Sequence, residues 1–352
     1  MAGALLGAAV GDALGLPREG LSPQRARRRF GDCVGHAFVF GRGMVSDDTE
    51  HTCLLAQALL TEPEDAARFS RALAWKLRWW LLGLPAGVGL GTARAIARLW
   101  LGFGADRSGV FSAGNGPAMR AALLGLCCRD DALGLRAWVR ASSRITHTDP
   151  RAERAAFLVA FAAGHAAQCS ATDIVPERFL AAASAASSDA DGELRAILAT
   201  MASHLADGAS PERFATALGL ERGVTGYAYH TVPVALYCWL RQPDDFRAVV
   251  TDVIRLGGDT DTTAAIAGAI CGATTGLTGI PAEWLDGIAE WPRSVEWMKQ
   301  LAERLARRFP LAQRPDPGAG PMRLCWPALL PRNLAFLGIV LAHGLGRLLP
   351  PY

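Results

Sequence analysis

Apolar positions recur three and four residues apart through most of the chain, a spacing that is typical of helices with one buried face. The Ala- and Leu-rich segments with this spacing are Thr52–Leu60, Ala66–Leu82, Ala118–Leu126, Arg151–Ala167, Leu194–Leu205, Ala264–Ala273 and Val295–Arg308. Runs of alternating β-branched residues are scarce. The apolar run Val232–Trp239 contains Pro233, which favours a helix with proline near its start over a strand. The pattern therefore predicts an all-α protein.

The helical pattern continues without an internal repeat to about residue 310, so we expect one domain over residues 1–310. Residues 311–352 are expected to form a linker, which includes RPDPGAGP at Arg314–Pro321, and a C-terminal tail helix. We expect this helix to dock on the bundle or on a second subunit rather than on a membrane surface. No stretch reaches about 20 uninterrupted apolar residues, so no membrane span is expected.

Composition narrows the class of protein. Hydrophobic residues make up 51% of the 352 residues, which excludes an intrinsically disordered chain. A formal net charge of +3 is too weak to indicate a dedicated nucleic-acid binder. The 8 cysteines include no CxxC pair, so we interpret them as reduced cysteines of a cytoplasmic protein.

Two acidic strings open predicted helices in the same way. Ser46-Asp47-Asp48-Thr49 precedes one apolar run, and Asp259-Thr260-Asp261-Thr262, after Gly257-Gly258, precedes another. Ser, Thr and Asp are the favoured N-cap residues, so capping alone could explain either string. A cap needs one such residue, however, and each string offers several.

A metal site explains both strings together. Adjacent carboxylates repel one another unless a cation lies between them. In a regular helix Asp259 and Asp261 would point about 200° apart, so their convergence requires a non-helical turn, which Gly257-Gly258 permits. If the two turns face each other, their carboxylates and hydroxyls form an all-oxygen ligand set that suits Mg²⁺ or Mn²⁺.

Two further strings are candidates for substrate binding. The string Ser112-Ala113-Gly114-Asn115-Gly116-Pro117 precedes a predicted helix, where backbone N–H groups could meet a phosphate, although a simple turn is the alternative. The string Thr146-His147-Thr148-Asp149-Pro150 contains a histidine that is either structural or part of a site.

Together these strings resemble the ADP-ribosylglycohydrolase family, which includes the dinitrogenase-reductase-activating glycohydrolase. The resemblance covers roughly residues 1–300. It rests on GALLGAAVGDALG with Glu19, SDDTEHT, SAGNGPAMR, ITHTDP, TGYAYHTVPVALYCWL and GGDTDTTAAIAGAICGA, in this order. It implies an orthogonal all-α helix bundle with two Mg²⁺ or Mn²⁺ ions, and hydrolysis of the bond between C1″ of ADP-ribose and an acceptor side chain.

The resemblance also assigns residues by position. It implies metal ligands at Ser46, Asp47, Asp48, Asp259, Asp261 and Thr262. It implies substrate contacts at Ser112, Gly114, Asn115, Gly116, His147, Gly226 and Tyr227. Catalytic roles are implied for Glu19, Asp47 and Asp261.

The implied partners are ADP-ribose and an ADP-ribosylated protein, modified on arginine or serine. Two alternatives remain open. One is a non-catalytic relative that binds ADP-ribose or serves a structural role, which would predict damaged metal positions. The other is a dinuclear hydrolase of a small ADP-ribosyl or nucleotide metabolite.

Overall fold

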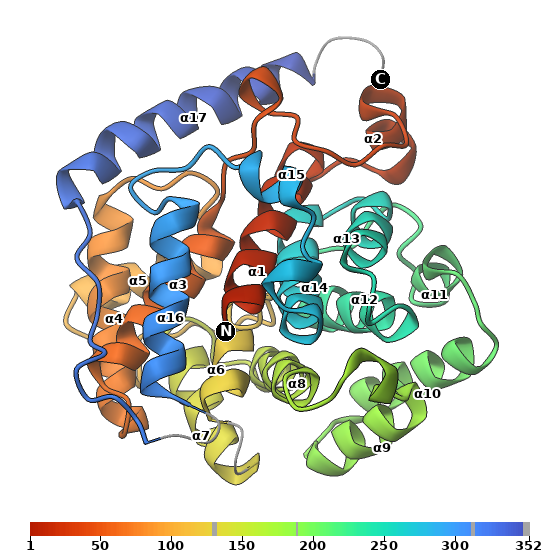
Figure 1. Cartoon of the computed structure of the whole chain (residues 1–352), viewed down its shortest axis with the longest axis horizontal. Helices are drawn as coiled ribbons and strands as arrows, with labels where there is room; N and C mark the ends of the chain where they lie inside the picture. Colours follow the sequence, from red (N-terminus) through yellow and green to blue (C-terminus); the bar gives the residue numbers. More distant parts are fainter. Residues whose placement is uncertain (129–131, 188, 311–313, 348–352) are drawn as a thin grey trace.

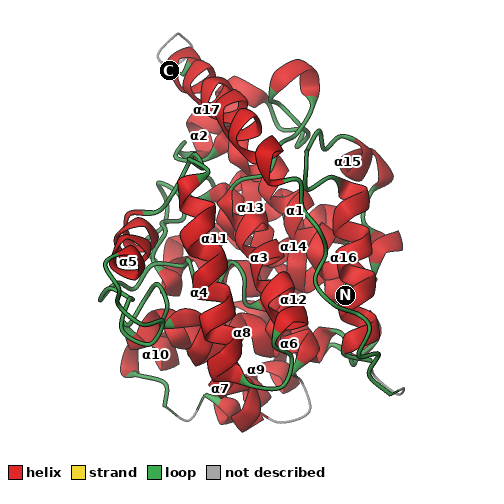
Figure 2. Cartoon of the chain, turned by 90° about the vertical axis from the view of Figure 1, so that its left-hand side faces the viewer, coloured by secondary structure: helices red, strands yellow, loops and turns green. Residues whose placement is uncertain are grey.

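The computed structural model describes residues 1–128, 132–187, 189–310 and 314–347, and they form helices and loops with no β-strand (Figure 2). The all-α prediction is confirmed. The helices are α1 (Ala2–Gly15), α2 (Pro23–Phe30), α3 (Asp47–Thr61), α4 (Ala66–Leu82), α5 (Leu90–Trp100), α6 (Ala122–Cys127), α7 (Ala132–Ser143), α8 (Pro150–Ala166), α9 (Pro176–Ala186), α10 (Gly192–Ala206), α11 (Pro211–Ala217), α12 (Ala228–Arg241), α13 (Phe246–Arg255), α14 (Thr260–Thr275), α15 (Ala282–Asp286), α16 (Val295–Arg308) and α17 (Leu329–Gly346).

The first helix and the fourteenth pack against each other at the centre of the molecule (Figure 1). Glycine stands at every fourth position of α1, at Gly3, Gly7, Gly11 and Gly15, and this stripe faces α14. A Cβ atom placed on Gly7 would lie 2.2 Å from the carbonyl oxygen of Gly268. The two backbones therefore approach more closely than any larger side chain would permit.

The register of this contact is antiparallel. Gly3 meets the carbonyl of Gly272, Gly7 that of Gly268, and Gly15 that of Thr260. The end of α1 therefore lies beside the start of α14. Around this pair, α3, α8, α12, α13 and α16 complete one continuous core.

Most predicted helices match the observed ones, and one does not. The segment Ala118–Leu126 was expected to be helical throughout, but α6 begins only at Ala122, after a turn over residues 116–120. The cause is the Arg120 side chain, which is completely buried. It donates to the carbonyl of Gly116 at 3.0 Å and to Ser142 and Thr146.

The tail forms α17, which runs across the top of the molecule in Figure 1 and ends near α2. The expectation that it docks on the bundle is met on one face, where Arg332, Asn333 and Phe336 are buried. Its outer face exposes a row of leucines at Leu330, Leu334, Leu337, Leu341 and Leu345. The expected absence of a membrane span is not confirmed, because Trp326–Gly346 is long and apolar enough to cross one by length and composition.

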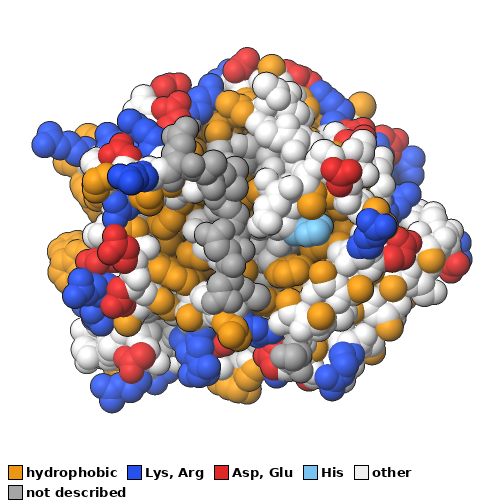
Figure 3. All heavy atoms as spheres, turned by 60° about the horizontal axis from the view of Figure 1, so that its bottom comes forward, with side chains coloured by type: hydrophobic (Ala, Val, Ile, Leu, Met, Phe, Trp, Pro, Cys, Tyr) orange, Lys and Arg blue, Asp and Glu red, His pale blue; other side chains and the backbone are white. Residues whose placement is uncertain are grey.

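Charges are mixed on the surface. On the face shown in Figure 3, basic and acidic side chains alternate around the rim, with hydrophobic side chains between them. The arginine run at Arg25–Arg29 lies on α2, where Arg25, Arg27 and Arg28 are exposed, as expected for a solvated helix face.

The Gly7→Ala variant tests whether the α1–α14 contact controls stability. The new methyl group would overlap the Gly268 carbonyl, so we expect a loss of about 1–3 kcal/mol in the free energy of unfolding. The matched control is Gly338→Ala in the middle of α17, where a Cβ atom would meet nothing within 4 Å. Because alanine favours helix over glycine, this control should be neutral or gain up to about 1 kcal/mol. Urea unfolding of both variants measures the contrast, and equal effects would contradict the interpretation.

Candidate metal centre and cleft

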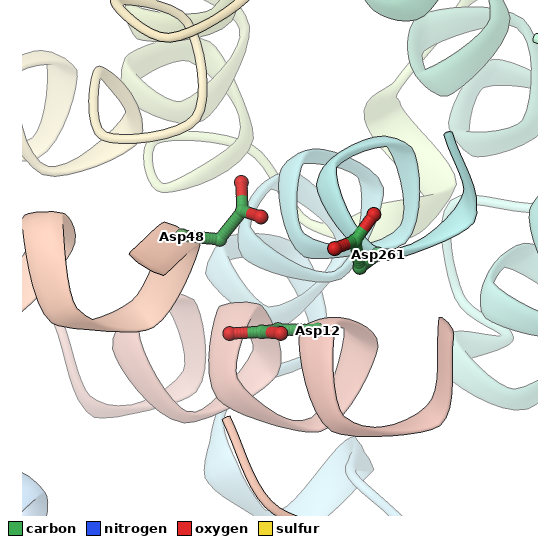
Figure 4. A group of neighbouring side chains, drawn as sticks. All are labelled: Asp12, Asp48 and Asp261. Atoms are coloured by element: carbon green, nitrogen blue, oxygen red, sulfur yellow. The ribbon is translucent and has the colours of Figure 1, made fainter. Parts of the chain in front are cut away.

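The two acidic turns meet in space, as the sequence predicts. Asp48 at the start of α3 and Asp261 at the start of α14 face each other, and Asp12 from α1 completes the group (Figure 4). One carboxylate oxygen from each lies within 4.8 Å of the others, and all three residues are buried. These three residues are called the acidic cluster below.

Side-chain capping accounts for one residue of the first string and for none of the second. Ser46 is the N-cap of α3, and its hydroxyl accepts a hydrogen bond from the Asp48 amide at 3.2 Å. Asp259 is the N-cap of α14 in position, but its side chain makes no capping hydrogen bond. Instead, its Oδ2 accepts a hydrogen bond from the Asn115 side chain at 2.7 Å. The carboxylates are therefore present in excess of what the helix starts need.

The glycine pair before Asp259 sets the approach of this turn. Gly257 and Gly258 have φ angles of +68° and +80°, a left-handed conformation that glycine adopts without strain. A Cβ atom on Gly258 would lie 1.9 Å from the Val224 carbonyl oxygen. This turn leaves Asp259 at φ −79° and ψ 70°, outside helical geometry. Both Asp259 and Asp261 can then line one cavity.

Asp12 is the member of the acidic cluster that was not predicted from the sequence. Its carboxylate accepts hydrogen bonds from the amides of Ser46 and Thr49 at 2.9–3.2 Å and from the Thr49 hydroxyl at 2.5 Å. It therefore ties the first turn of α3 to α1. The available signal was a single carboxylate within the otherwise apolar run Ala2–Gly15, which is buried from Gly3 onward.

The cluster has ligand capacity to spare. Asp48 Oδ2 accepts from the hydroxyls of Ser46 and Thr262, both at 3.1 Å. Asp48 Oδ1 and Asp261 Oδ1 are buried, and neither has a hydrogen-bond partner among the described residues. Buried oxygens of this kind are costly unless something binds them. Because every nearby ligand atom is oxygen, the site fits a hard divalent cation such as Mg²⁺ or Mn²⁺.

Burial and mutual repulsion dominate the electrostatics. Withdrawal from water raises the pKa of Asp12 to about 6, against hydrogen bonds from Thr49 and Ser46 that lower it. Burial, followed by neighbouring carboxylates, raises the pKa values of Asp47, Asp48 and Asp261 well above the ordinary range. A bound cation would lower these pKa values again, because it favours the charged form of each carboxylate.

A cavity of about 440 Å³ opens beside the cluster. It is large enough for a nucleotide-sized ligand, since such sites typically measure about 300–1,000 Å³. Of the residues expected to form the site, it is lined by Glu19, Asp47, Asn115, Gly116, His147, Gly226, Asp259, Asp261 and Thr262. A larger cavity of about 780 Å³ lies between α4 and α7, away from the acidic cluster, and its lining is mainly apolar with several arginines.

His147 lies in the wall of the smaller cavity, surrounded by glycines. Cβ atoms placed on Gly91, Gly114 and Gly116 would come within 2.9–3.1 Å of its ring. Burial, together with the charge of Arg120, lowers the pKa of His147 to about 4, so the ring is neutral at ordinary pH. The glycines of the SAGNG string therefore admit this ring to the wall.

The remaining expected substrate residues surround the cleft without lining it. Ser112 accepts a hydrogen bond from the Gly114 amide at 3.4 Å, and Tyr227 donates to Glu193 at 2.9 Å. The Asn115 amide donates to the Gly226 carbonyl at 3.0 Å, which joins the two substrate strings. The prediction that a helix begins at Pro117 is wrong, because α6 begins five residues later, at Ala122. Any anion contact here would come from the loop itself.

The chain is similar to a known family of proteins and to several of its relatives. The family model described as ADP-ribosylglycohydrolase matches residues 1–315. An ADP-ribosyl-dinitrogen reductase glycohydrolase of Rhodospirillum rubrum is 28% identical over 289 residues, which cover 80% of this chain and 88% of that protein. The ADP-ribosylarginine hydrolase Tri1 of Pseudomonas putida is 28% identical over 327 residues, covering 89% of this chain and 80% of that protein.

A solved structure agrees with these relatives. A chain titled "ADP-ribosylglycohydrolase-related protein complex" superposes with a TM-score of 0.63 at 29% sequence identity. The match covers 87% of this chain and 96% of that chain.

The Asp261→Asn variant tests the cation site through stability. Burial, followed by repulsion from neighbouring carboxylates, raises the pKa of Asp261, so folding of the metal-free protein takes up protons and its stability falls as pH rises above the ordinary value of 3.8. The variant lacks this penalty. Without metal at neutral pH it should therefore be more stable than the wild type by at least about 1 kcal/mol, and the difference should shrink toward pH 3.8.

Adding Mn²⁺ or Mg²⁺ should reverse the order. The wild type should gain melting temperature with either ion, whereas Asp261→Asn should gain little. The control is Asp286→Asn, an exposed carboxylate that should respond to metal as the wild type does. An equal metal response in Asp261→Asn and the wild type would remove Asp261 from the site.

Proposed function

The chain belongs to the ADP-ribosylglycohydrolase family, and from that premise we propose that it removes ADP-ribose from a modified protein side chain by metal-dependent hydrolysis at C1″. The observation that carries the proposal is the pair of buried, unpartnered oxygens, Asp48 Oδ1 and Asp261 Oδ1, beside a cavity of about 440 Å³. A structural relative that had lost catalysis would have no reason to keep this costly arrangement.

The acidic residues divide into two groups by position. Asp48, Asp261 and Thr262 converge from two helix starts and would hold a first cation, with Ser46 behind them. Asp47 and Asp259 line the cavity and would share a second cation with Asp261. When bound, the cations supply Lewis-acid polarisation of ribose oxygens and a lower pKa for a nearby water.

The remaining residues bind and orient the substrate. We place the distal ribose toward the acidic cluster and the pyrophosphate along Ser112–Gly116. The neutral ring of His147 contacts the sugar side of the cavity, and Gly226 leaves the opposite wall open beside Asp259. Tyr227 contributes from the rim, where Arg151 and Glu193 hold its hydroxyl.

Proton transfer falls to carboxylates at the cavity wall. Asp47 lines the cavity and lies beside the acidic cluster, so it is placed to orient a water and accept its proton. Glu19 is an exposed residue that lines the same cavity, and it is placed to exchange a proton with the leaving group. Asp261 lies in the first turn of α14, which holds it in place, and it would act as a metal ligand.

We propose arginine as the first acceptor to test. The relative with an arginine-directed name aligns over 89% of this chain. Serine-linked ADP-ribose is the second acceptor to test. A small ADP-ribosyl metabolite is the remaining substrate class.

The decisive experiment compares ADP-ribose release from ADP-ribosylarginine, an ADP-ribosylserine peptide and free nucleoside diphosphates, with and without Mg²⁺ or Mn²⁺. We expect metal-dependent release from an ADP-ribosylated side chain. The Asp48→Ala variant should lower kcat at least about a hundredfold and retain the helical circular dichroism. The Asp286→Ala control should keep the wild-type rate.

Other outcomes separate the alternatives. Tight ADP-ribose binding by calorimetry without any turnover would identify a non-catalytic reader. Cleavage of the free nucleotides alone would identify a small-molecule hydrolase. Wild-type turnover in Asp48→Ala would contradict the assigned metal site.

A further inference from the structure

Helix α17 and its C-cap residue, Arg347, donate side-chain hydrogen bonds to the backbone of three separate segments. Arg332 donates to the Val45 carbonyl at 2.6 Å. Asn333 donates to the Gly83 carbonyl at 2.6 Å. Arg347 donates to the Glu19 carbonyl at 2.7 Å and to the Pro17 carbonyl at 3.0 Å. Backbone acceptors of this kind fix the path of a segment whatever its side chains.

Each of these segments leads directly into the candidate site. Val45 precedes Ser46 and the first acidic turn. Gly83 begins the loop that contributes Gly87 and Gly89 to the cavity wall. Glu19 is itself a cavity residue. One helix near the end of the chain therefore contacts the backbone behind three parts of the cleft.

The underside of α17 adds an apolar contact with the same segments. Phe336 is buried, and it packs with Leu16, Phe38, Met44 and Ala86 in a small cluster separate from the main core. Apolar packing therefore holds the helix against the cleft segments in addition to these four hydrogen bonds.

The segment around Glu19 depends most on this helix. On one side, the Gly20 amide donates to the Gly258 carbonyl at 2.7 Å, which ties the segment to the second acidic turn. On the other side, the guanidinium of Arg347 donates hydrogen bonds to the carbonyl oxygens of Pro17 and Glu19. Glu19 therefore lies between the Gly258 turn and the C-terminal end of α17.

We propose that α17 is a positioning element of the cleft and that Arg347 is the positioning residue for Glu19. The proposal rests on the proposed function, because it assigns Glu19 to the reaction. Arg347 does not line the cavity. Its two hydrogen bonds fix the backbone that carries the Glu19 carboxylate, so their loss changes where that carboxylate lies. The family match ends at residue 315, so this contribution comes from the chain beyond the matched region.

The test compares Arg347→Ala, Arg347→Lys and Arg323→Ala, the last being an exposed tail arginine as control. Hydrogen exchange of the peptide covering residues 16–22 should be faster in Arg347→Ala, whereas exchange in α14 should stay unchanged. On the cleaved substrate, kcat should fall about ten- to a hundredfold, with KM changed less than kcat. Arg347→Lys should recover part of the protection from hydrogen exchange and part of kcat, because a lysine ammonium can donate a hydrogen bond to one of the two carbonyl oxygens. Arg323→Ala should match the wild type.

Several results would overturn the proposal. One is unchanged exchange over residues 16–22 in Arg347→Ala, and another is faster exchange there without a fall in kcat. A third is a uniform rise in exchange that includes α14, because this would mark Arg347 as a general stabilising residue. If the wild type cleaves no ADP-ribosyl substrate, the proposed function fails, and the exchange data alone decide whether Arg347 holds the segment.

Discussion

The close approach of α1 and α14 is the constraint on which the rest of the molecule depends. Because glycine stands wherever the two backbones cross, helices from opposite ends of the matched region lie in direct contact. Their antiparallel register brings Asp12, near the end of α1, beside Asp261, at the start of α14. Asp12 in turn holds the first turn of α3, which carries Asp48. The position of the acidic cluster is thus a consequence of backbone packing.

The acidic cluster lowers the stability of the metal-free fold at the same place where the proposed function needs it. Three buried carboxylates within 4.8 Å destabilise the metal-free fold, and their raised pKa values express that cost. The positive ends of the helix dipoles of α3 and α14 offset part of it. The surrounding core, which holds the helices rigidly, offsets the rest. A divalent cation would convert the repulsion into ligation without moving the helices.

The sequence predicted the elements well and the connections between them less well. Apolar spacing located α4 and α16 to the residue, and the acidic strings indicated a shared site because their carboxylates exceeded the needs of capping. A lone carboxylate in an apolar run marked Asp12, but its partners lie 34–37 positions away, so local patterns could not show what it binds. The start of α6 was misplaced because a buried arginine overrides the helix propensity of its own segment. The glycine at every fourth position of α1 was a usable signal for close packing.

The contacts of Arg332 have a consequence for shortened versions of this protein. Its guanidinium pairs with both oxygens of Glu290 at 2.6 and 2.8 Å and lies 3.5 Å from Glu50, which also binds Arg293. Ending the chain at the boundary of the family match would remove Arg332 from this quartet, together with the helix that covers Glu290. Glu290 would lose its bidentate partner, and the cluster around Phe336 would lose its central side chain. The boundary of homology is therefore a poor guide to where the folding unit ends.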